Sequence, residues 1–272
     1  MSYIADFHTH SSFSDDSNET MENVIQAAIK LGMPEIAITE HMDIGYPETP
    51  DMGAGVFNLN TDSYLYDLIK NKEKFKDQIN VLFGVEIGLQ QQYMREIAVY
   101  AKSYDFDYII GSMHVLPEGD PYYPEFFSGR TDEEVYQEYL QETLACVKRF
   151  HNFDVLGHMT YIIRYGMEKD KNFSYSKYKT VIDKILEVLV DNGNGIELNT
   201  ASLRKGLAEI TPGIEILKKY VELGGEVVTV GSDAHVASEV GADFEIARQM
   251  MLDAGLKYYA TFEKRSVRYN KL

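Results

Sequence analysis

Cysteine, tryptophan, basic side chains and long apolar runs are all scarce in this sequence. Its 272 residues include one cysteine and no tryptophan. The single thiol, Cys146, excludes an intrachain disulfide and is typical of a reducing cytoplasm, so we expect a cytoplasmic location with Cys146 buried in a helix. No apolar run reaches the roughly 18 residues of a membrane span. The N-terminus also lacks the basic and long apolar regions of a signal peptide.

Positive charge is in short supply as well. The 26 Lys and Arg residues face 43 Asp and Glu residues, which gives a net charge of −17. This balance excludes a general nucleic-acid-binding or membrane-binding surface, because both need basic patches. An anionic substrate would therefore need local positive charge, from metal ions or from a few arginines.

Short apolar runs of β character recur along the chain, and helical patterns separate most of them. They are "YIADFHTH", "EIAITEHM", "NVLFGVEIGL", "FDYIIGSMHV", "FDVLGHMTY", "GNGIELNT" and "EVVTVGSDAH". Alternating strands and helices predict an α/β fold with a parallel sheet. We expect a distorted (β/α)7 TIM-like barrel. No repeat, low-complexity segment or linker divides the chain, so we expect residues 1–272 to form a single domain.

Helix boundaries are marked by capping residues. The pattern predicts helices over Thr20–Leu31 with Gly32 as a stop, from the Thr131/Glu134 capping box to about Arg149, over Ser174–Asp191 before Gly193, and from a first-turn Pro212 to Leu223. One segment breaks the rhythm: "DIGYPETPDMGAGVFNLN", residues 43–60, is a long loop after the second run. Loops of this length in compact domains are usually functional. Whether it closes over a substrate is left open.

Six of the seven histidines lie at the C-terminal end of a predicted strand. They are His8, His10, His41, His114, His158 and His235, and the carboxylates Glu86 and Asp233 lie at strand ends too. The C-terminal ends of parallel barrel strands open onto one face, where active sites are built. Only His151 misses the pattern, and we interpret it as a surface or turn histidine.

Imidazoles and carboxylates without a thiolate cluster suit zinc, iron or manganese. These ligands are too many for one ion, and a carboxylate such as Glu86 can bridge two. We therefore expect two to three divalent metal ions at the C-terminal face of the strands. Such sites are suited to hydrolysis, and their charge would attract a phosphate to an otherwise acidic protein.

The motifs "DFHTHSSFSDD", "TEH", "GVEI", "GSMH", "LGH" and "GSDAH" resemble, in order, those of the polymerase-and-histidinol-phosphatase (PHP) superfamily. The segment "GSMHVLPEGDPYYPEFFSGRTDEEVYQEYLQE" is similar to that of its monofunctional histidinol-phosphate phosphatases. The resemblance implies a single PHP-type catalytic domain over residues 1–272. It also implies a metal-dependent phosphomonoesterase that hydrolyses L-histidinol phosphate to L-histidinol and phosphate in histidine biosynthesis.

The resemblance also implies three metal sites. His8, His10, Glu86 and Asp233 would hold the first ion, Glu86, His114 and His158 the second, and Asp16, His41 and His235 the third. Many members of the superfamily carry histidine where this chain has Asp16. Aspartate is an acceptable ligand, but the change can weaken or reselect the third metal. The alternative for Asp16 is capping of the following helix, and Asp15 competes for the ligand role.

Two arginines follow strands on the same face. Arg204 and Arg164 carry guanidinium groups suited to phosphate oxygens, and we expect both to bind the phosphate, with Arg204 stabilising the developing charge. Lys205 is interpreted as a solvated neighbour. Tyr122, with Tyr123, Phe126, Glu118, Asp120 and Glu125, offers an aromatic and acidic wall for a cationic aminoalcohol.

Other interpretations stay open. Asp233, His235 and Asp16 are candidate proton donors to the leaving group, and the sequence does not choose among them. The substrate could instead be a nucleotide or another small phosphate ester, cleaved by a PHP-type phosphatase or phosphodiesterase. An amidohydrolase-like enzyme is disfavoured because no lysine lies at a predicted strand end. A non-catalytic metal-binding domain is disfavoured because the ligand set is full. We expect no nucleic-acid or membrane partner, and a homo-oligomer is left open.

Overall fold

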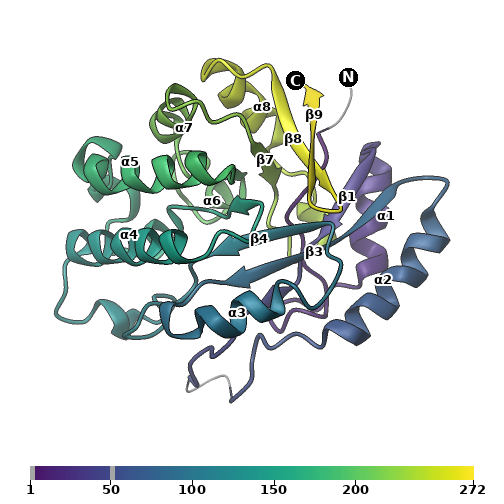
Figure 1. The fold of residues 1–272 in the computed structure, drawn as a ribbon, viewed down its shortest axis with the longest axis horizontal. Helices are drawn as coiled ribbons and strands as arrows, with labels where there is room; N and C mark the ends of the chain where they lie inside the picture. The colour runs from purple at the N-terminus through teal and green to yellow at the C-terminus, as the bar shows by residue number, and fades with distance from the viewer. Residues whose placement is uncertain (1–3, 50–52) are drawn as a thin grey trace.

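Parallel strands form the centre of the computed structural model, which describes residues 4–49 and 53–272 (Figure 1). The sheet has the order β1-β3-β4-β5-β6-β7, with β2 also paired to β3, and every pairing in it is parallel. Its strands are β1 (Glu35–Ile38), β2 (His41–Met42), β3 (Asn80–Gly88), β4 (Tyr108–Ser112), β5 (Val155–Leu156), β6 (Gly195–Asn199) and β7 (Val228–Gly231). The predicted parallel α/β architecture is confirmed.

The first predicted strand differs from expectation. Within its described part, residues 4–10, only two isolated bridges form, from Asp6 to Ile36 and from Thr9 to Ala234. The segment nevertheless closes the barrel. Phe7 N donates to Val230 O at 3.0 Å on one side, and Thr39 N donates to Thr9 O at 2.8 Å on the other. These residues therefore lie between β7 and β1, as a distorted TIM-like barrel requires.

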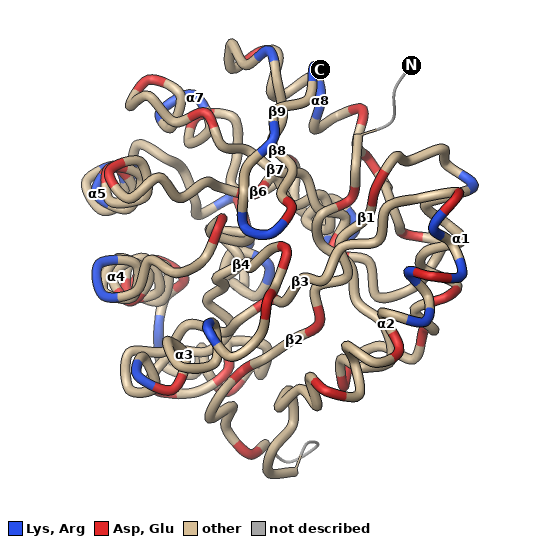
Figure 2. Tube along the Cα trace, turned by 45° about the vertical axis from the view of Figure 1, so that its right-hand side comes forward, with Lys and Arg blue, Asp and Glu red and all other residues tan. Residues whose placement is uncertain are grey.

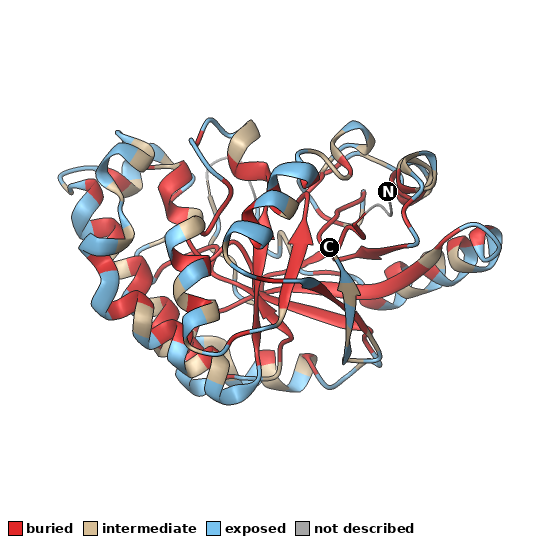
Figure 3. Ribbon diagram, turned by 90° about the horizontal axis from the view of Figure 1, so that it is seen from above, coloured by how far each residue is buried: buried red, intermediate tan, exposed pale blue. Residues whose placement is uncertain are grey.

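Burial explains why these segments are strands. The apolar residues of β1, β3, β4 and β7 are buried on both faces, as parallel strands covered by helices must be. Figure 3 shows the buried strands at the centre and the exposed residues on the outer sides of the helices. The core is thus the barrel interior together with the layer between strands and helices.

Helices surround the strands as a ring (Figure 2). The α-helices are α1 (Met21–Leu31), α2 (Thr61–Phe75), α3 (Met94–Tyr100), α4 (Asp132–Arg149), α5 (Tyr175–Asn192), α6 (Ala201–Arg204), α7 (Ile214–Glu222) and α8 (Phe244–Asp253). Short 3₁₀ turns are η1 (Gln91–Tyr93), η2 (Pro124–Phe127), η3 (Tyr161–Arg164), η4 (Lys169–Asn172) and η5 (Ala237–Glu239). None of the helices within the described ranges is both long and apolar enough to cross a bilayer.

Three of the four predicted helices are confirmed with their caps. Thr20 caps α1 and Gly32 ends it in the left-handed conformation, Thr131 and Glu134 form the capping box of α4, and Gly193 ends α5. Cys146 is buried in α4, and burial raises the pKa of its thiol to about 12. The start of α7 is the exception. Gly213 is its N-cap, so Pro212 precedes the helix instead of opening its first turn.

The C-terminal hairpin was not predicted from the sequence. Strands β8 (Tyr258–Glu263) and β9 (Ser266–Lys271) pair antiparallel beside β7 (Figure 1). At the hairpin turn, Lys264 N donates to Asp107 Oδ1 at 3.0 Å, and Arg265 Nε donates to Asp154 Oδ2 at 2.6 Å. Asp107 and Asp154 immediately precede β4 and β5, so the turn covers the N-terminal end of the barrel. The opposite end is left for the candidate site.

Candidate metal centre and substrate pocket

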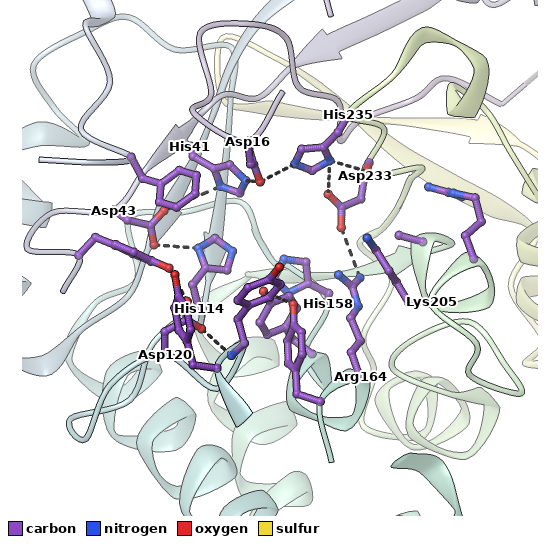
Figure 4. A pocket seen from close by; sticks show the side chains of 18 of the residues that line it. Asp16, His41, Asp43, His114, Asp120, His158, Arg164, Lys205, Asp233 and His235 are labelled. Carbon is purple, nitrogen blue, oxygen red and sulfur yellow. Dashed lines mark hydrogen bonds and ion pairs between the residues drawn. The ribbon is translucent and has the colours of Figure 1, made fainter. Parts of the chain in front are cut away.

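Titratable side chains gather at the C-terminal end of the barrel (Figure 4). Each arrives on a different strand or on the loop that follows it, so the parallel sheet alone brings together residues that are far apart in the chain. The set is His8 and His10 in the closing segment, His41 in β2, Glu86 in β3, His114 after β4, His158 after β5, and Asp233 and His235 after β7. His151 is exposed, as predicted.

Glu86 is the centre of this group, and its carboxylate is fully buried. Oε2 lies 3.1 Å from His8 Nε2, 3.5 Å from His10 Nε2 and 3.0 Å from His41 Nδ1, while Oε1 lies 3.1 Å from His114 Nε2 and 2.8 Å from His158 Nε2. Burial alone would raise the pKa of Glu86. The imidazoles of His8, His114 and His41 outweigh burial and hold the pKa well below its usual range.

Two aspartates complete the cluster. Asp233 Oδ1 lies 3.8 Å from His8 Nε2 and 3.6 Å from His10 Nε2. Asp16 Oδ2 lies 3.0 Å from His235 Nε2 and 3.5 Å from His41 Nε2. His41 thus presents one ring nitrogen to Asp16 and the other to Glu86.

The structure distinguishes the contacts of Asp16 from those of its neighbour Asp15. Thr20, not Asp16, caps α1. The Asp15 carboxylate accepts a hydrogen bond from Phe57 N at 2.6 Å, so it ties the first loop to the 43–60 loop. Of the two aspartates, Asp16 is the one beside the histidines.

Several buried polar atoms of the cluster lack a hydrogen-bond partner among the described residues. They are His8 Nε2, His10 Nε2, His41 Nδ1 and Glu86 Oε2. Buried polar atoms almost always have a hydrogen-bond partner. Three imidazole nitrogens and one carboxylate oxygen without a partner in one cluster therefore call for an explanation. Four overlapping groups of three ligand atoms from these residues lie within 4.8 Å of one another. Nitrogen and carboxylate oxygen donors at such distances fit zinc, iron or manganese.

A pocket of about 400 Å³ opens above the cluster. Arg164, from η3, and Arg204, at the end of α6, both line it, as does the exposed Lys205. Arg164 Nη2 donates to Asn199 Oδ1 at 2.9 Å and lies 3.3 Å from Asp233 Oδ2, while Arg204 Nη2 donates to Ser232 O at 2.5 Å. Arg164 Nε and Arg204 Nη1 are buried and have no partner within the described chain. Both guanidinium groups therefore retain a free N–H.

Aromatic and acidic side chains form another part of the pocket wall. Tyr122, Tyr123 and Asp120 line it, together with Tyr46 and Phe57 from the 43–60 loop. The Tyr46 hydroxyl donates to Asp120, so the two loops meet at the pocket. Phe126 instead lies against the guanidinium of Arg130, 5.0 Å from its ring centroid. Residues 50–52 of the long loop lie outside the described residues, and its role as a lid stays a prediction.

Two carboxylates, Asp43 and Glu197, contact the histidine ring nitrogens that face away from Glu86, and neither was predicted from the sequence. Asp43 Oδ1 lies 2.8 Å from His114 Nδ1, and Glu197 Oε1 lies 2.5 Å from His8 Nδ1. A signal for Glu197 and Asn199 was present, because they alternate on β6 and so face the same side as each other. Asp43, two residues after His41, belongs to a loop and had no comparable signal.

A closed parallel barrel with an imidazole–carboxylate cluster at the C-terminal strand ends defines a class of metal-binding domains. The PHP domain model matches residues 6–201. The chain belongs to the PHP domain family.

Relatives across the full length support this assignment. A probable histidinol-phosphatase of Clostridium acetobutylicum is 35% identical over 98% of this chain and 99% of its own length. A histidinol-phosphatase of Lactococcus lactis is 31% identical over 98% and 97%. The crystal structure of the histidinol phosphate phosphatase of Lactococcus lactis, complexed with zinc, L-histidinol and phosphate, matches with a TM-score of 0.89 at 30% identity, over 98% of this chain and all of that one.

Proposed function

We propose that this protein is a metal-dependent phosphomonoesterase that hydrolyses L-histidinol phosphate to L-histidinol and phosphate. The observation that carries the proposal is the pocket itself. It has unpaired buried ligand atoms at its base and two arginines with free N–H groups on its wall. The full-length similarity to a phosphatase solved with zinc, L-histidinol and phosphate supports the same substrate.

We propose two to three divalent ions, held as the family resemblance implies. His8, His10, Glu86 and Asp233 would hold one ion, Glu86, His114 and His158 a second, and Asp16, His41 and His235 a third. The contacts of both Glu86 oxygens with separate sets of imidazoles support its role as a bridge. Bound ions of this kind lower the pKa of water and stabilise charge on phosphoryl oxygens.

The arginines would bind the phosphate. Arg164 and Arg204 line the pocket and each has an unpaired buried N–H, and guanidinium groups bind phosphate oxygens through charge-assisted hydrogen bonds. Arg164 is already held by Asn199 and Asp233, and Arg204 by the carbonyl of Ser232 with Glu239 3.5 Å from its Nε, so each guanidinium group is oriented before the substrate arrives. Arg204 would also stabilise charge that develops on the phosphoryl group.

Asp120 and the tyrosines would recognise the cationic end of the substrate. Asp120, Tyr46 and Tyr122 line the same pocket as the arginines. A carboxylate and electron-rich rings favour an ammonium or imidazolium group. The leaving alkoxide would take its proton from Asp233, His235 or Asp16, and His235 lies between the other two, 3.0 Å from Asp16 and 3.6 Å from Asp233.

We further propose that residues 1–272 work as one catalytic domain in the cytoplasm. Asp233 and His235 lie beyond the segment matched by the family model, yet they contact Asp16, His8 and His10 near the start of the chain. The net charge of −17 supports a small-molecule substrate and no nucleic-acid partner.

The test combines elemental analysis of the purified protein with phosphate release. We expect two to three metal ions per chain and turnover that a chelator abolishes. We also expect kcat/KM for L-histidinol phosphate to exceed that for p-nitrophenyl phosphate and for a nucleoside monophosphate. A preference for the nucleotide would favour the alternative phosphatase or phosphodiesterase. Unchanged turnover in the metal-free protein would contradict the proposal.

A further inference from the structure

A buried carboxylate lies directly behind the first histidine of the cluster. Glu197, in β6, is 1% exposed. Its Oε1 is 2.5 Å from His8 Nδ1. Its Oε2 accepts hydrogen bonds from the backbone N–H of His158 at 2.8 Å and from Asn199 Nδ2 at 3.2 Å. One carboxylate therefore holds the ring of His8 and the backbone of His158.

His8 and His158 contact different oxygens of Glu86. His8 Nε2 is 3.1 Å from Glu86 Oε2, and His158 Nε2 is 2.8 Å from Glu86 Oε1. Glu197 thus supports both sides of the carboxylate at the centre of the cluster. Among the described residues, His8 is the only base within ion-pair distance of Glu197. Both oxygens of Glu197 are therefore directed at residues of the cluster.

His8 and His158 depend on Glu197 in different ways. The contact at His8 Nδ1 leaves Nε2 free to face Glu86 and Asp233. His158 Nδ1 is buried without a partner in the described structure, so its ring has no equivalent support. Its backbone has a φ of 21°, at the edge of the left-handed region, which a non-glycine residue adopts when its surroundings hold it there. The hydrogen bond from His158 N to Glu197 supplies that hold.

Space for Glu197 comes from a glycine in the neighbouring strand. A Cβ at Gly231 would lie 2.3 Å from Glu197 Oε1 and 2.3 Å from His8 Cβ. Strand β7 can therefore approach the pair only because residue 231 has no side chain. Asp43 contacts the ring of His114 at 2.8 Å and lies 3.8 Å from that of His41, and Ser14 Oγ contacts His10 Nδ1 and accepts from His41 N, both at 3.1 Å. Of these partners, Glu197 is the one that contacts His8.

We propose that Glu197 is a positioning residue that sets the affinity of the cluster for divalent ions, by fixing His8 in its Nδ1-protonated form and the backbone of His158 at the same time. This inference rests on the metal binding in the proposed function. Metal-binding imidazoles generally donate their second N–H to a carboxylate or carbonyl, and loss of that partner costs about 10–100-fold in metal affinity or activity.

The test is Glu197→Gln, which keeps the shape of the side chain. An amide has one acceptor oxygen, so it cannot accept from both His8 Nδ1–H and His158 N–H, and its NH₂ group must face a donor. We expect zinc affinity of the apo-protein, measured by competition with a chromophoric chelator, to fall about 10–100-fold. Circular dichroism should show the same fold.

The matched control is Asp154→Asn. Asp154 is also a buried carboxylate that accepts a hydrogen bond from a strand N–H, that of Ile109 at 2.7 Å, but it lies at the other end of the barrel. We expect this variant to keep wild-type zinc affinity. A second measurement needs no variant: nitrogen-15 NMR of the zinc-loaded wild-type protein should show His8 protonated at Nδ1.

Two results would overturn the inference. One is wild-type zinc affinity in folded Glu197→Gln, and the other is a zinc-loaded wild-type protein with His8 protonated at Nε2. If Glu197→Gln does not fold, the NMR measurement decides. A wild-type protein that binds no zinc, iron or manganese would overturn the proposed function as well, so the two failures are distinguishable.

Discussion

Glu86 contacts five imidazoles through its two oxygens. Both sets of contacts need an oxygen atom, so they depend on the side chain being a carboxylate. Three imidazole nitrogens lie within 3.5 Å of Oε2 and two lie within 3.1 Å of Oε1. An amide would place an NH₂ group against one of these sets, where it would repel any bound cation. The chemistry of one side chain therefore decides whether the two sides of the cluster can be joined.

We predict that Glu86→Gln lowers turnover by more than the roughly 10–100-fold typical of losing a residue that only supports a metal ligand. The expected cause is loss of the proposed bridge between two ions, so metal content should fall with activity. Phosphate release and elemental analysis of the same preparation measure both. Glu35→Gln is the control, because Glu35 is also a buried strand glutamate but pairs with Arg268 away from the cluster. Full activity and full metal content in Glu86→Gln would contradict the assignment.

We predict that Arg204→Lys lowers kcat/KM by roughly tenfold to 150-fold, the equivalent of about 1.5–3 kcal/mol for one hydrogen bond to a charged group. Lysine keeps the charge but loses the fork that reaches both the Ser232 carbonyl and the pocket. Steady-state kinetics with L-histidinol phosphate measure the loss. Arg248→Lys, on the surface of α8, serves as the reference and should behave as wild type. Equal kcat/KM values for the two variants would contradict the proposed role of Arg204 in binding the phosphate.

Much of this site was predictable from single residues and their spacing. His8 and His10 alternate along the closing segment, and a period of two brings such a pair to one side. Asp233 and His235 are also two residues apart, but Asp233 has a φ of 54°, so their 3.6 Å contact does not follow from strand geometry. Asp43 and Glu197 were not singled out because their role lies in contacts with His114 and His8, residues 71 and 189 positions away. The alternation of Glu197 and Asn199 on β6 indicates a shared face, but the contacts themselves follow from the closed barrel.

Helices and strands differ in how clearly the sequence marks them. Gly32 at the end of α1, the Thr131/Glu134 box of α4 and Gly193 after α5 were correctly identified, because a cap is a local interaction between neighbours in the chain, but Thr20 was not predicted as the N-cap of α1. The β8–β9 hairpin was missed. Its turn places Lys264 and Arg265 at φ of 49° and 62°, where Asn-Gly or Asp-Gly would be the usual signal. Contacts with Asp107 and Asp154 hold this turn, and they come from distant strands.

We predict that Thr131→Ala destabilises the protein by about 1 kcal/mol without changing activity. Thr131 Oγ1 accepts from Glu134 N at 3.3 Å, and Glu134 Oε2 accepts from Thr131 N at 2.8 Å, so the change breaks the capping box of α4. Urea unfolding compared with kinetics measures both effects. Ser128→Ala, just before the helix, is the control and should leave the free energy of unfolding within about 0.5 kcal/mol of wild type. Equal stability of the two variants would show that the box contributes nothing.

The molecule as a whole carries a net charge of −17, and many of its buried acids and histidines meet at one end of the barrel. The cluster joins residues from His8 to His235. Ions bound there would connect both ends of the chain with the strands between them. Metal binding is therefore expected to stabilise the whole fold, as well as to serve catalysis.

We predict that a chelator lowers the melting temperature, because ions that bind only the folded state add about 2.7 kcal/mol of stability at a free concentration one hundred times Kd. Differential scanning calorimetry with and without chelator measures the shift, and added zinc should reverse it. His151→Ala should show the same shift as wild type, since His151 is exposed and outside the cluster. An unchanged melting temperature after verified metal removal would contradict this prediction.

The closing segment between β7 and β1 has a consequence for how the protein is made. His8 and His10 are translated more than two hundred residues before Asp233, and at about 5–20 residues per second they wait for roughly ten seconds or longer. Throughout that interval the barrel lacks β7, and the backbone of residues 7–10 lacks its hydrogen bonds to Val230 and Ala234. A nascent chain therefore cannot assemble the complete set of cluster residues until residue 235 has been made, and a full set of ions would bind only after β7 has joined the barrel.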